Sequence, residues 1–239
     1  MRSGLVLVSG APATKVATLV GDDQPLILRG QPRRYVSRGG DKLRAALDRF
    51  SVDPAGCECL DAGASTGGFT DCLLQAGAAR VIAFDVGYGQ LAWALRTDDR
   101  VIVVERQNAR ELEPGSLAFD PAIVVADLSF ISLRAVVAAL AGVARTDATF
   151  LVLVKPQFEA GPRHVGKGGV VREPAVWRTV LDDVASAFSR QGLGPAGIMA
   201  SPVLGPAGNV EFVLHARKGS AASTLNLDAA VAEALEVRG

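Results

Sequence analysis

The stretch Asp61-Ala-Gly-Ala-Ser-Thr-Gly-Gly-Phe69 decides the fold class of this 239-residue chain. The apolar run Cys57-Glu-Cys-Leu60 leads into it, and the helical pattern Phe69-Thr-Asp-Cys-Leu-Leu-Gln-Ala-Gly77 leads out of it. A strand, a glycine-rich turn and a helix in this order are how α/β folds hold a nucleotide-like cofactor at their strand ends. The glycines carry no Cβ and let the backbone approach the ligand. The stretch therefore predicts a cofactor-binding turn, the alternative being an ordinary tight turn in another α/β domain.

The spacing of the glycines narrows the cofactor class. Three residues separate Gly63 from Gly67, so the turn is not the Gly-x-Gly-x-x-Gly of dinucleotide sites, and it suits a smaller cofactor such as S-adenosylmethionine. Asp85 ends the next apolar run, where an acid accepts hydrogen bonds from a ribose; the alternative for it is a surface acid. Asp61 either orients the turn or binds the cofactor's ammonium group. The expected cofactor contacts are Asp61, Gly63, Ala64, Ser65, Thr66, Gly67, Gly68, Phe69, Asp85, Val86, Asp127 and Leu128.

Strand-like and helical patterns alternate from Cys57 onward. Strands are expected at 57–62, 80–86, 101–106, 122–128, 148–155, 197–200 and 209–216, and helices at 41–50, 66–76, 90–95, 133–143, 174–191 and 225–237. Such alternation predicts an α/β fold with a seven-stranded, mostly parallel sheet, helices on both faces and one antiparallel strand in a terminal hairpin. The expected organisation is a small β-rich piece at 1–30, a linker at 31–36, the main domain at 37–218 and a tail or helix at 219–239.

Four charged residues lie where core packing does not explain them. Asp127 and Lys155 end the fourth and fifth expected strands, Glu211 opens the last one, and Lys42 lies in the first helix of the main domain. Open α/β sheets place their ligands at strand ends, and a charge beside an apolar strand is costly unless it is paired or faces a cleft. We therefore expect a polar site there, the alternative being unrelated surface salt bridges.

The charge distribution points to a local basic patch. The formal net charge is +0, yet residues 1–50 hold nine Lys and Arg against four Asp and Glu. Clustered basic side chains can bind a phosphate backbone whatever the total charge, while the alternative is a solvated linker. The expected phosphate contacts are Arg33, Arg34, Arg38, Arg44, Arg163 and Lys167.

Cysteine and histidine usage argues against disulfides and metals. Cys57, Cys59 and Cys72 form no disulfide framework, and only His164 and His215 accompany them, so no metal site is expected. Free thiols suit a reducing compartment, and no apolar run is long enough to cross a bilayer. We therefore expect a cytoplasmic protein without a membrane partner.

Long segments of the chain match one known family in order. They are Ser37-Arg-Gly-Gly-Asp-Lys42, Leu60–Thr70, Asp85–Leu91, Ala126–Ser132, Val154–Glu159, Val165–Val171 and Gly208–Glu211. On these segments the chain resembles the TlyA family, the hemolysin A-like 2′-O-methyltransferases of ribosomal RNA, which is itself similar to the FtsJ/RrmJ methyltransferases. The resemblance runs from about Tyr35 to Ala216. It implies a Rossmann-like methyltransferase sheet that binds S-adenosylmethionine.

The resemblance also assigns roles to the four charged residues. It implies a catalytic Lys-Asp-Lys-Glu tetrad at Lys42, Asp127, Lys155 and Glu211. The implied reaction is methylation of a ribose 2′-oxygen in ribosomal RNA, with cytidine as the expected nucleotide and ribosomal subunits as partners. Base N-methyltransferases usually carry an Asn/Asp-Pro-Pro-aromatic motif after the fourth strand. Here Leu-Ser-Phe follows Asp127, which disfavours methylation of an exocyclic amine.

The N-terminal piece departs from the family pattern. Family members normally begin with an S4 RNA-binding domain of two helices and a hairpin. Gly4-Leu-Val-Leu-Val-Ser-Gly10 matches the hairpin, and the sequence holds no counterpart of the helices, so residues 1–30 are expected to form a partial S4-like hairpin. Two other functions stay open: an RNA-binding or ribosome-assembly factor with little catalysis, and a membrane-acting hemolysin.

Overall fold

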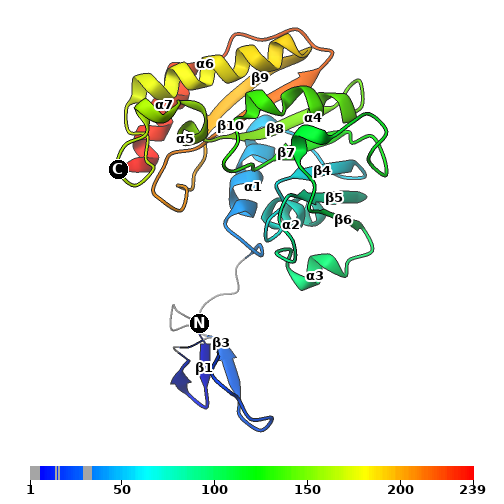
Figure 1. The fold of residues 1–239 in the computed structure, drawn as a ribbon, viewed down its shortest axis with the longest axis vertical. Helices are drawn as coiled ribbons and strands as arrows, with labels where there is room; N and C mark the ends of the chain where they lie inside the picture. Colours follow the sequence, from blue (N-terminus) through cyan, green and yellow to red (C-terminus); the bar gives the residue numbers. More distant parts are fainter. Residues whose placement is uncertain (1–5, 14, 16, 29–33) are drawn as a thin grey trace. The chain divides into compact units, whose positions relative to one another are not determined.

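The computed structural model describes residues 6–13, 15, 17–28 and 34–239. It divides into two compact units, Met1–Arg34 and Tyr35–Gly239. In the first unit β1 (Val6–Val8) pairs antiparallel with both β2 (Ala11–Pro12) and β3 (Leu26–Leu28), as drawn in Figure 1. These short strands agree with the small β-rich piece that the sequence predicts. The expected domain boundaries at 30, 36 and 218 stay predictions.

The second unit is built on one seven-stranded sheet with the order β6-β5-β4-β7-β8-β10-β9. The pairings among β6, β5, β4, β7 and β8 are all parallel, and β10 runs antiparallel to both of its neighbours. This confirms the predicted mostly parallel sheet with one antiparallel strand. The strands are β4 (Glu58–Ala62), β5 (Arg80–Asp85), β6 (Val101–Glu105), β7 (Ile123–Ala126), β8 (Thr149–Val154), β9 (Leu193–Ala200) and β10 (Phe212–Lys218).

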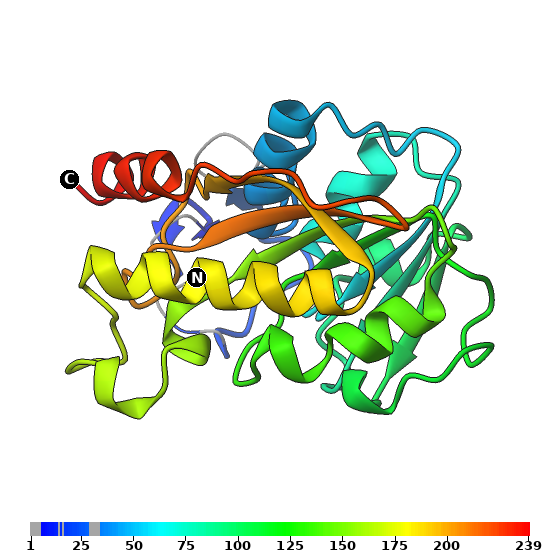
Figure 2. The same cartoon turned by 90° about the horizontal axis from the view of Figure 1, so that it is seen from above.

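Helices cover both faces of this sheet (Figures 1 and 2). The helices are α1 (Gly39–Phe50), α2 (Gly68–Gln75), α3 (Trp93–Arg96), α4 (Val137–Val143), α5 (Pro156–Glu159), α6 (Pro174–Arg190) and α7 (Leu227–Arg238). The apolar side chains of α1 and α2 pack on one face, and those of α4 and α6 pack on the other. No helix within the described residues has the length and apolar character needed to span a membrane.

Strand β8 shows why the sequence reads as a buried α/β fold. Phe150, Val152 and Val154 point into the core beneath α4 and α6, whereas Leu151 and Leu153 point into the core beneath α1 and α2. Because successive side chains of a strand alternate between the two faces, a strand covered on both sides must be apolar throughout. The continuous apolar run from Phe150 to Val154 is the result.

The structure differs from the predicted elements in several places: the last strand, expected at 209–216, is β10 at Phe212–Lys218, and the short helix α5 was not predicted. The expected helix at 133–143 is a 3-10 helix, η2 (Leu133–Ala135), followed by α4, because Val136 leaves helical geometry with φ −121°. The expected helix at 90–95 is only α3, since Ala92 is extended with ψ 139°. Strand β9 begins at Leu193, four residues earlier than predicted, because its pairing with β10 continues to Leu193 beyond a register shift between His215 and Ala216.

The sheet order brings one group of strand ends together. Register places Ala62 beside both Phe84 and Ala126, and Val154 beside Phe212. The carboxyl ends of β4, β5, β7 and β8 therefore meet the start of β10 at one edge of the sheet. Parallel α/β sheets carry their ligands at this edge.

Candidate active site

The glycine turn after β4 can be built only without side chains at two positions. Gly63 has φ +88° and Gly67 has φ +97°, which lie in the left-handed region that favours glycine. A Cβ at Gly63 would lie 2.7 Å from the carbonyl oxygen of Asp127, and a Cβ at Gly67 would overlap the Leu95 side chain. The turn thus packs directly against the residues that follow β7.

Asp61 holds the start of α2 from beneath the turn. Its side chain is fully buried, and Oδ2 accepts hydrogen bonds from Thr70 N at 2.8 Å and Thr70 Oγ1 at 2.7 Å. Oδ1 has no hydrogen-bond partner among the described residues. Burial raises the pKa of this carboxyl to about 7, because removal from water disfavours the charged form. Of the two sequence hypotheses for Asp61, this geometry favours orientation of the turn.

A cavity of about 500 Å³ opens beside the turn. Gly63, Ser65, Asp85, Val86, Asp127 and Leu128 line it, together with Gln90, Gln107, Asn108 and Arg110. Asp85 Oδ2 accepts from Ser65 N at 2.7 Å and Asp85 Oδ1 accepts from Gly87 N at 2.6 Å. Six of the twelve residues expected to contact the cofactor therefore face this one cavity.

The four charged residues singled out in the sequence meet at a second, neighbouring cavity of about 210 Å³. Lys42 Nζ lies 2.5 Å from Glu211 Oε2, and Lys155 Nζ lies 2.5 Å from Asp127 Oδ1. Lys42, Lys155 and Glu211 are buried. The residues come from α1, from the ends of β7 and β8, and from the start of β10. The turn residues Ala64, Thr66, Gly68 and Phe69, which do not line the first cavity, line this one.

A buried ion pair, Lys42–Glu211, beside a buried lysine paired with the half-buried Asp127 is an expensive arrangement. Desolvation of both charges offsets much of their attraction, and leaving one partner buried alone costs about 3–5 kcal/mol. Buried pairs are therefore weak evidence of a stability role. A cluster of this kind in a cavity next to a ligand-binding turn indicates a functional site.

Comparison with known proteins identifies the fold's family. Residues 35–218 match the family model of FtsJ-like methyltransferases. The chain belongs to this family. The match confirms the resemblance seen in the sequence motifs and makes the chain an FtsJ-like methyltransferase.

Three relatives illustrate the match. The chain is 51% identical over 216 residues to a Mycobacterium tuberculosis protein named 16S/23S rRNA (cytidine-2'-O)-methyltransferase TlyA, covering 90% of this chain and 81% of the relative. The solved structure of a Streptococcus thermophilus protein named for hemolysin is 39% identical with a TM-score of 0.84, covering 99% of this chain and 88% of that one. A Mesorhizobium loti S-adenosylmethionine-dependent methyltransferase, 13% identical with a TM-score of 0.54 over 73% of this chain and 96% of that one, shares the fold.

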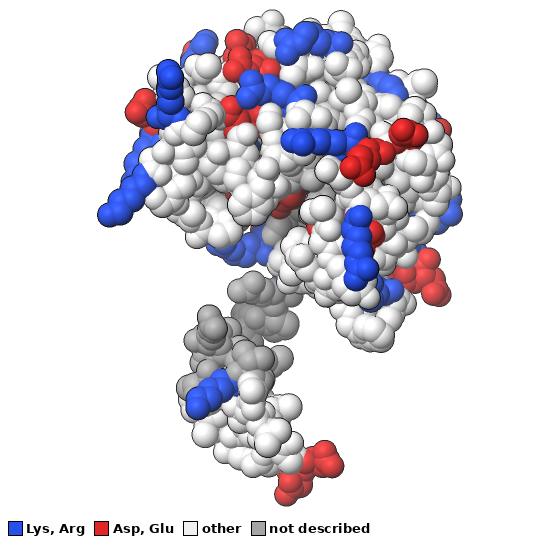
Figure 3. All heavy atoms as spheres, in the orientation of Figure 1, with Lys and Arg blue, Asp and Glu red and all other residues white. Residues whose placement is uncertain are grey.

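The predicted RNA-binding residues of the FtsJ-like chain are less clearly gathered than the tetrad. Arg38 precedes α1 and is exposed, as are Arg163 and Lys167 in the loop after α5. Arg44 is held by Asp48 of the same helix, with Nε 3.0 Å from Oδ2. Arg34 is exposed in the first unit, and Arg33 lies outside the described residues. On the face seen in Figure 3, basic and acidic side chains are interspersed. RNA binding by these residues stays a prediction.

Several residues that line these cavities were not predicted from the sequence, among them Ser129 and Phe130. Ser129 lines both of them and its Oγ accepts a hydrogen bond from Lys155 Nζ at 2.8 Å. Phe130 is 92% exposed, has φ +63° and lies with its ring 5.2 Å from that of Phe158. Both lie in the matched segment Ala126–Ser132, which was the available signal. An exposed phenylalanine in strained backbone is unusual and points to a role outside the core.

Proposed function

We propose that this FtsJ-like chain transfers a methyl group from S-adenosylmethionine to a ribose 2′-oxygen of ribosomal RNA, with cytidine as the target nucleotide. The observation that carries the proposal is the pairing of two buried lysines with two carboxylates at a cavity that shares its wall with the glycine turn. The M. tuberculosis relative named for cytidine 2′-O-methylation supports the choice of substrate. We also propose a cytoplasmic location, where ribosomal RNA is found.

The larger cavity fits the cofactor. The oxygens Oδ1 and Oδ2 of Asp85 each accept one backbone N–H, and a carboxylate oxygen has two lone pairs, so both retain acceptor capacity for ribose hydroxyls. Gly63 and Gly67 keep the wall of the turn free of side chains. When bound, S-adenosylmethionine would supply a methyl group activated by the positive sulfonium. The neighbouring Asp127 provides a negative charge between this cavity and Lys155.

The smaller cavity suits activation of a ribose hydroxyl. A hydroxyl is a poor nucleophile and must lose its proton as the new bond to the methyl carbon forms. In our proposal Lys155 Nζ holds the 2′-oxygen and stabilises the negative charge that develops on it, while the proton passes to water in the open cavity. Asp127 and Ser129 fix the direction of that ammonium group. The Lys42–Glu211 pair, from α1 and the start of β10, lines the same cavity.

The substrate follows from the same chemistry. DNA lacks the 2′-hydroxyl, so a site built for this oxygen acts on RNA. Arg38, Arg163 and Lys167 are exposed and available for phosphate contacts, as the sequence predicts. Phe130 offers an exposed aromatic face at the cavity, onto which a nucleobase can stack.

The test is to map 2′-O-methylation on ribosomal RNA incubated with the purified chain and S-adenosylmethionine. We expect a ribose methyl mark that is absent when Lys155→Ala replaces the wild type. Equal marking by both proteins, or marking of a base nitrogen, would contradict the proposal. An RNA-binding factor with little catalysis would bind the RNA without any mark. No observation favours a hemolysin over the methyltransferase.

A further inference from the structure

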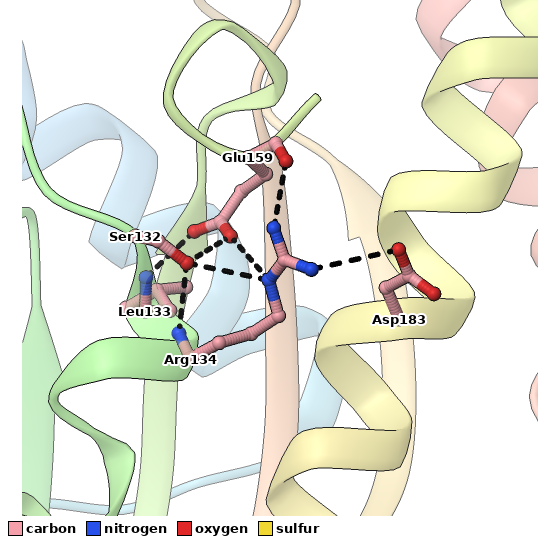
Figure 4. Close-up of polar contacts among 5 residues, drawn as sticks. All are labelled: Ser132, Leu133, Arg134, Glu159 and Asp183. Atoms are coloured by element: carbon pink, nitrogen blue, oxygen red, sulfur yellow. Dashed lines mark hydrogen bonds and ion pairs between the residues drawn. The ribbon is translucent and has the colours of Figure 1, made fainter. Parts of the chain in front are cut away.

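Glu159 is a buried carboxylate that the proposed chemistry does not use. It ends α5, is 6% exposed and lines neither of the two cavities. Figure 4 shows donors converging on it: Leu133 N on Oε1 at 2.6 Å, Ser132 Oγ on Oε2 at 2.5 Å and Arg134 Nε on Oε2 at 3.2 Å. Arg134 Nη2 also donates to the Glu159 carbonyl oxygen at 2.8 Å. A buried carboxylate is tolerated only when it is satisfied in this way.

All these donors belong to one segment that also carries active-site residues. We call residues 127–134, which leave β7 and enter η2, the β7 loop. Asp127 and Ser129 at its start contact Lys155, and Ser132, Leu133 and Arg134 at its end contact Glu159. Lys155 and Glu159 are themselves four residues apart, at the end of β8 and in α5. The two segments are thus joined at these two points, and between them by the contact of the Phe130 ring with the Phe158 ring of α5.

The part of the β7 loop between these two points is strained. Phe130 has φ +63°, a left-handed conformation that costs about 1–3 kcal/mol for a non-glycine residue. Such a conformation persists only where the surrounding structure holds it. The contacts to Lys155 and Glu159 flank this residue on either side. Without the contacts at 132–134, the loop would keep its Lys155 contacts and the Phe130–Phe158 ring contact but would lose the anchor at its far end.

We propose that Glu159 is a positioning residue for methyl transfer. It holds the far end of the β7 loop, and through the loop it fixes Ser129 and the direction of Lys155 Nζ. This inference rests on the proposed function. Displacement of a reacting group by about 1 Å can cost roughly 10²-fold in rate, so a group that never touches substrate can still control kcat.

Glu159→Gln is the central variant because it keeps the size of the side chain. The amide nitrogen would face either donor group of the β7 loop, so one contact becomes donor against donor. We expect kcat on ribosomal RNA to fall by about 10- to 100-fold. The KM for RNA and the affinity for S-adenosylmethionine should change by less than about 3-fold. A residue that only stabilises the fold would lower the melting temperature and leave the kcat of the folded protein unchanged.

Matched variants separate the positioning role from folding. Asp183, on α6, is the outer partner of Arg134, with Oδ2 3.6 Å from Arg134 Nη1. Asp183→Asn removes this charge and leaves Glu159 untouched. It should keep wild-type kcat. Ser132→Ala should reproduce part of the loss and Ser132→Thr, which keeps the hydroxyl, should restore it. The Ser132 pair replaces Glu159→Gln if that variant does not fold.

A double-mutant cycle tests the route through Ser129. If Glu159 acts by fixing Ser129 against Lys155, then Glu159→Gln costs much less in a Ser129→Ala background than alone. Multiplicative losses from the two changes would overturn this route. Wild-type kcat in both Glu159→Gln and Ser132→Ala would overturn the positioning role itself.

Hydrogen–deuterium exchange tests the same inference without activity. Glu159→Gln should speed exchange in peptides covering 127–134 and leave those covering β9 and α7 unchanged. Unchanged exchange in the β7 loop would overturn the inference. If Glu159→Gln speeds exchange as expected but the wild type marks no RNA, the proposed function fails while the loop-holding role stands. The two failures are therefore distinguishable.

Discussion

Each lysine of the candidate active site faces a carboxylate away from bulk water. Lys42 with Glu211 and Lys155 with Asp127 are close enough for charge-assisted contact. Only Lys155 also reaches Ser129, at the wall between the two cavities. In a buried setting the partners determine where the ammonium points more than how stable the fold is. Lys155 is therefore the residue we expect to act on the 2′-oxygen.

Lys155→Ala should abolish methyl transfer and spare cofactor binding, because the side chain acts on the nucleophile and not on the sulfonium. Single-turnover rates on ribosomal RNA measure the first effect, and calorimetry with S-adenosylmethionine measures the second. Lys42→Ala and Glu211→Ala should lose as much or less, since they position the site. A near-normal rate in Lys155→Ala would refute the tetrad assignment.

Asp61 should make stability depend on pH near neutrality. Burial raises the pKa of the folded carboxyl from 3.8 to about 7, so the folded protein takes up a proton near pH 7 and the unfolded chain does not until far lower pH. Its contribution is complete below 3.8 and is lost as pH rises through about 7. As the pH falls from about 8 to about 5, the free energy of unfolding of the wild type should rise by roughly 2 kcal/mol relative to that of Asp61→Asn.

Urea unfolding at several pH values measures this difference. The comparison with Asp61→Asn removes contributions from other titrating groups, because only position 61 differs. Asparagine keeps an oxygen to accept from Thr70. Parallel stability curves for the two proteins would show that Asp61 has an ordinary pKa in the folded state.

At the scale of elements, α1 reaches the site by packing closely on α2. A Cβ at Gly68 would overlap Ser37 Oγ and lie 3.0 Å from Gly40 N, and a Cβ at Gly40 would overlap the Tyr35 ring. Glycines at these contacts allow the backbones to approach. The close packing matters because α1 places Lys42 against Glu211, directly before β10. The motif Ser37-Arg-Gly-Gly-Asp-Lys42 is thus a packing motif as well as a source of charge.

Gly68→Ala should separate α1 from α2 and displace Lys42. We expect a loss of about 1–3 kcal/mol in the free energy of unfolding, together with a lower kcat. Gly142→Ala in α4 is the matched control. Its Cβ would meet Pro114 only at 3.7 Å, and alanine stabilises a helix interior by roughly 0.5–1 kcal/mol relative to glycine. Equal effects of the two changes on stability and activity would contradict this account.

The loop between α5 and α6 is anchored beside the tetrad. Asn209, two residues before Glu211, accepts from Val171 N at 3.0 Å and donates to Gly169 O at 2.9 Å. The exposed side chains of Arg163 and Lys167 belong to this loop. The contacts of Asn209 hold this loop near Glu211, before β10, and this position favours a role next to bound RNA.

Arg163→Gln with Lys167→Gln should weaken RNA binding and flatten its salt dependence. Each lost phosphate contact changes the slope of log K against log salt by about 0.7–0.9. The pair should therefore lower the slope by roughly 1.5. Filter binding to ribosomal RNA across a salt series measures it, with Arg145→Gln as the control, since Arg145 lies in the turn before β8, at the other end of that strand from Lys155. An unchanged slope would remove the loop from the RNA interface.

At the scale of the whole molecule, everything that the proposed chemistry uses lies in one unit. Both cavities and all four charged residues belong to Tyr35–Gly239. The first unit contributes three short strands, and among its described residues Leu7 in β1 and Ala13 after β2 are buried. A sheet of three short strands is at best marginally stable by itself.

A chain that starts at Tyr35 should therefore fold and bind S-adenosylmethionine like the full chain. Its kcat/KM on ribosomal subunits should be lower if the hairpin contacts RNA, as the resemblance implies. Calorimetry and a methylation assay at several subunit concentrations measure the two properties. Loss of cofactor binding in the shortened chain would show that the units depend on each other, and equal kcat/KM would exclude an RNA role for the hairpin.

The features that follow from the amino-acid sequence alone are those that depend on local pattern. The apolar run of β8, the alternation of strands and helices, and the glycine turn at Gly63–Gly67 each follow from the period or the chain geometry of a few neighbouring residues. The same patterns marked Asp127, Lys155 and Glu211 as charges at strand ends. The family match then confirmed the fold that these elements predict.

Contacts between distant side chains, in contrast, depend on how the strands and helices are arranged in space. Lys42 and Glu211 are 169 residues apart, and their contact depends on β10 inserting between β8 and β9, an order that no local pattern specifies. The contacts of Glu159 likewise depend on α5 lying against the β7 loop. Secondary structure is determined by periodicity along the chain, whereas these pairings are determined by strand order and by the need to satisfy buried charge.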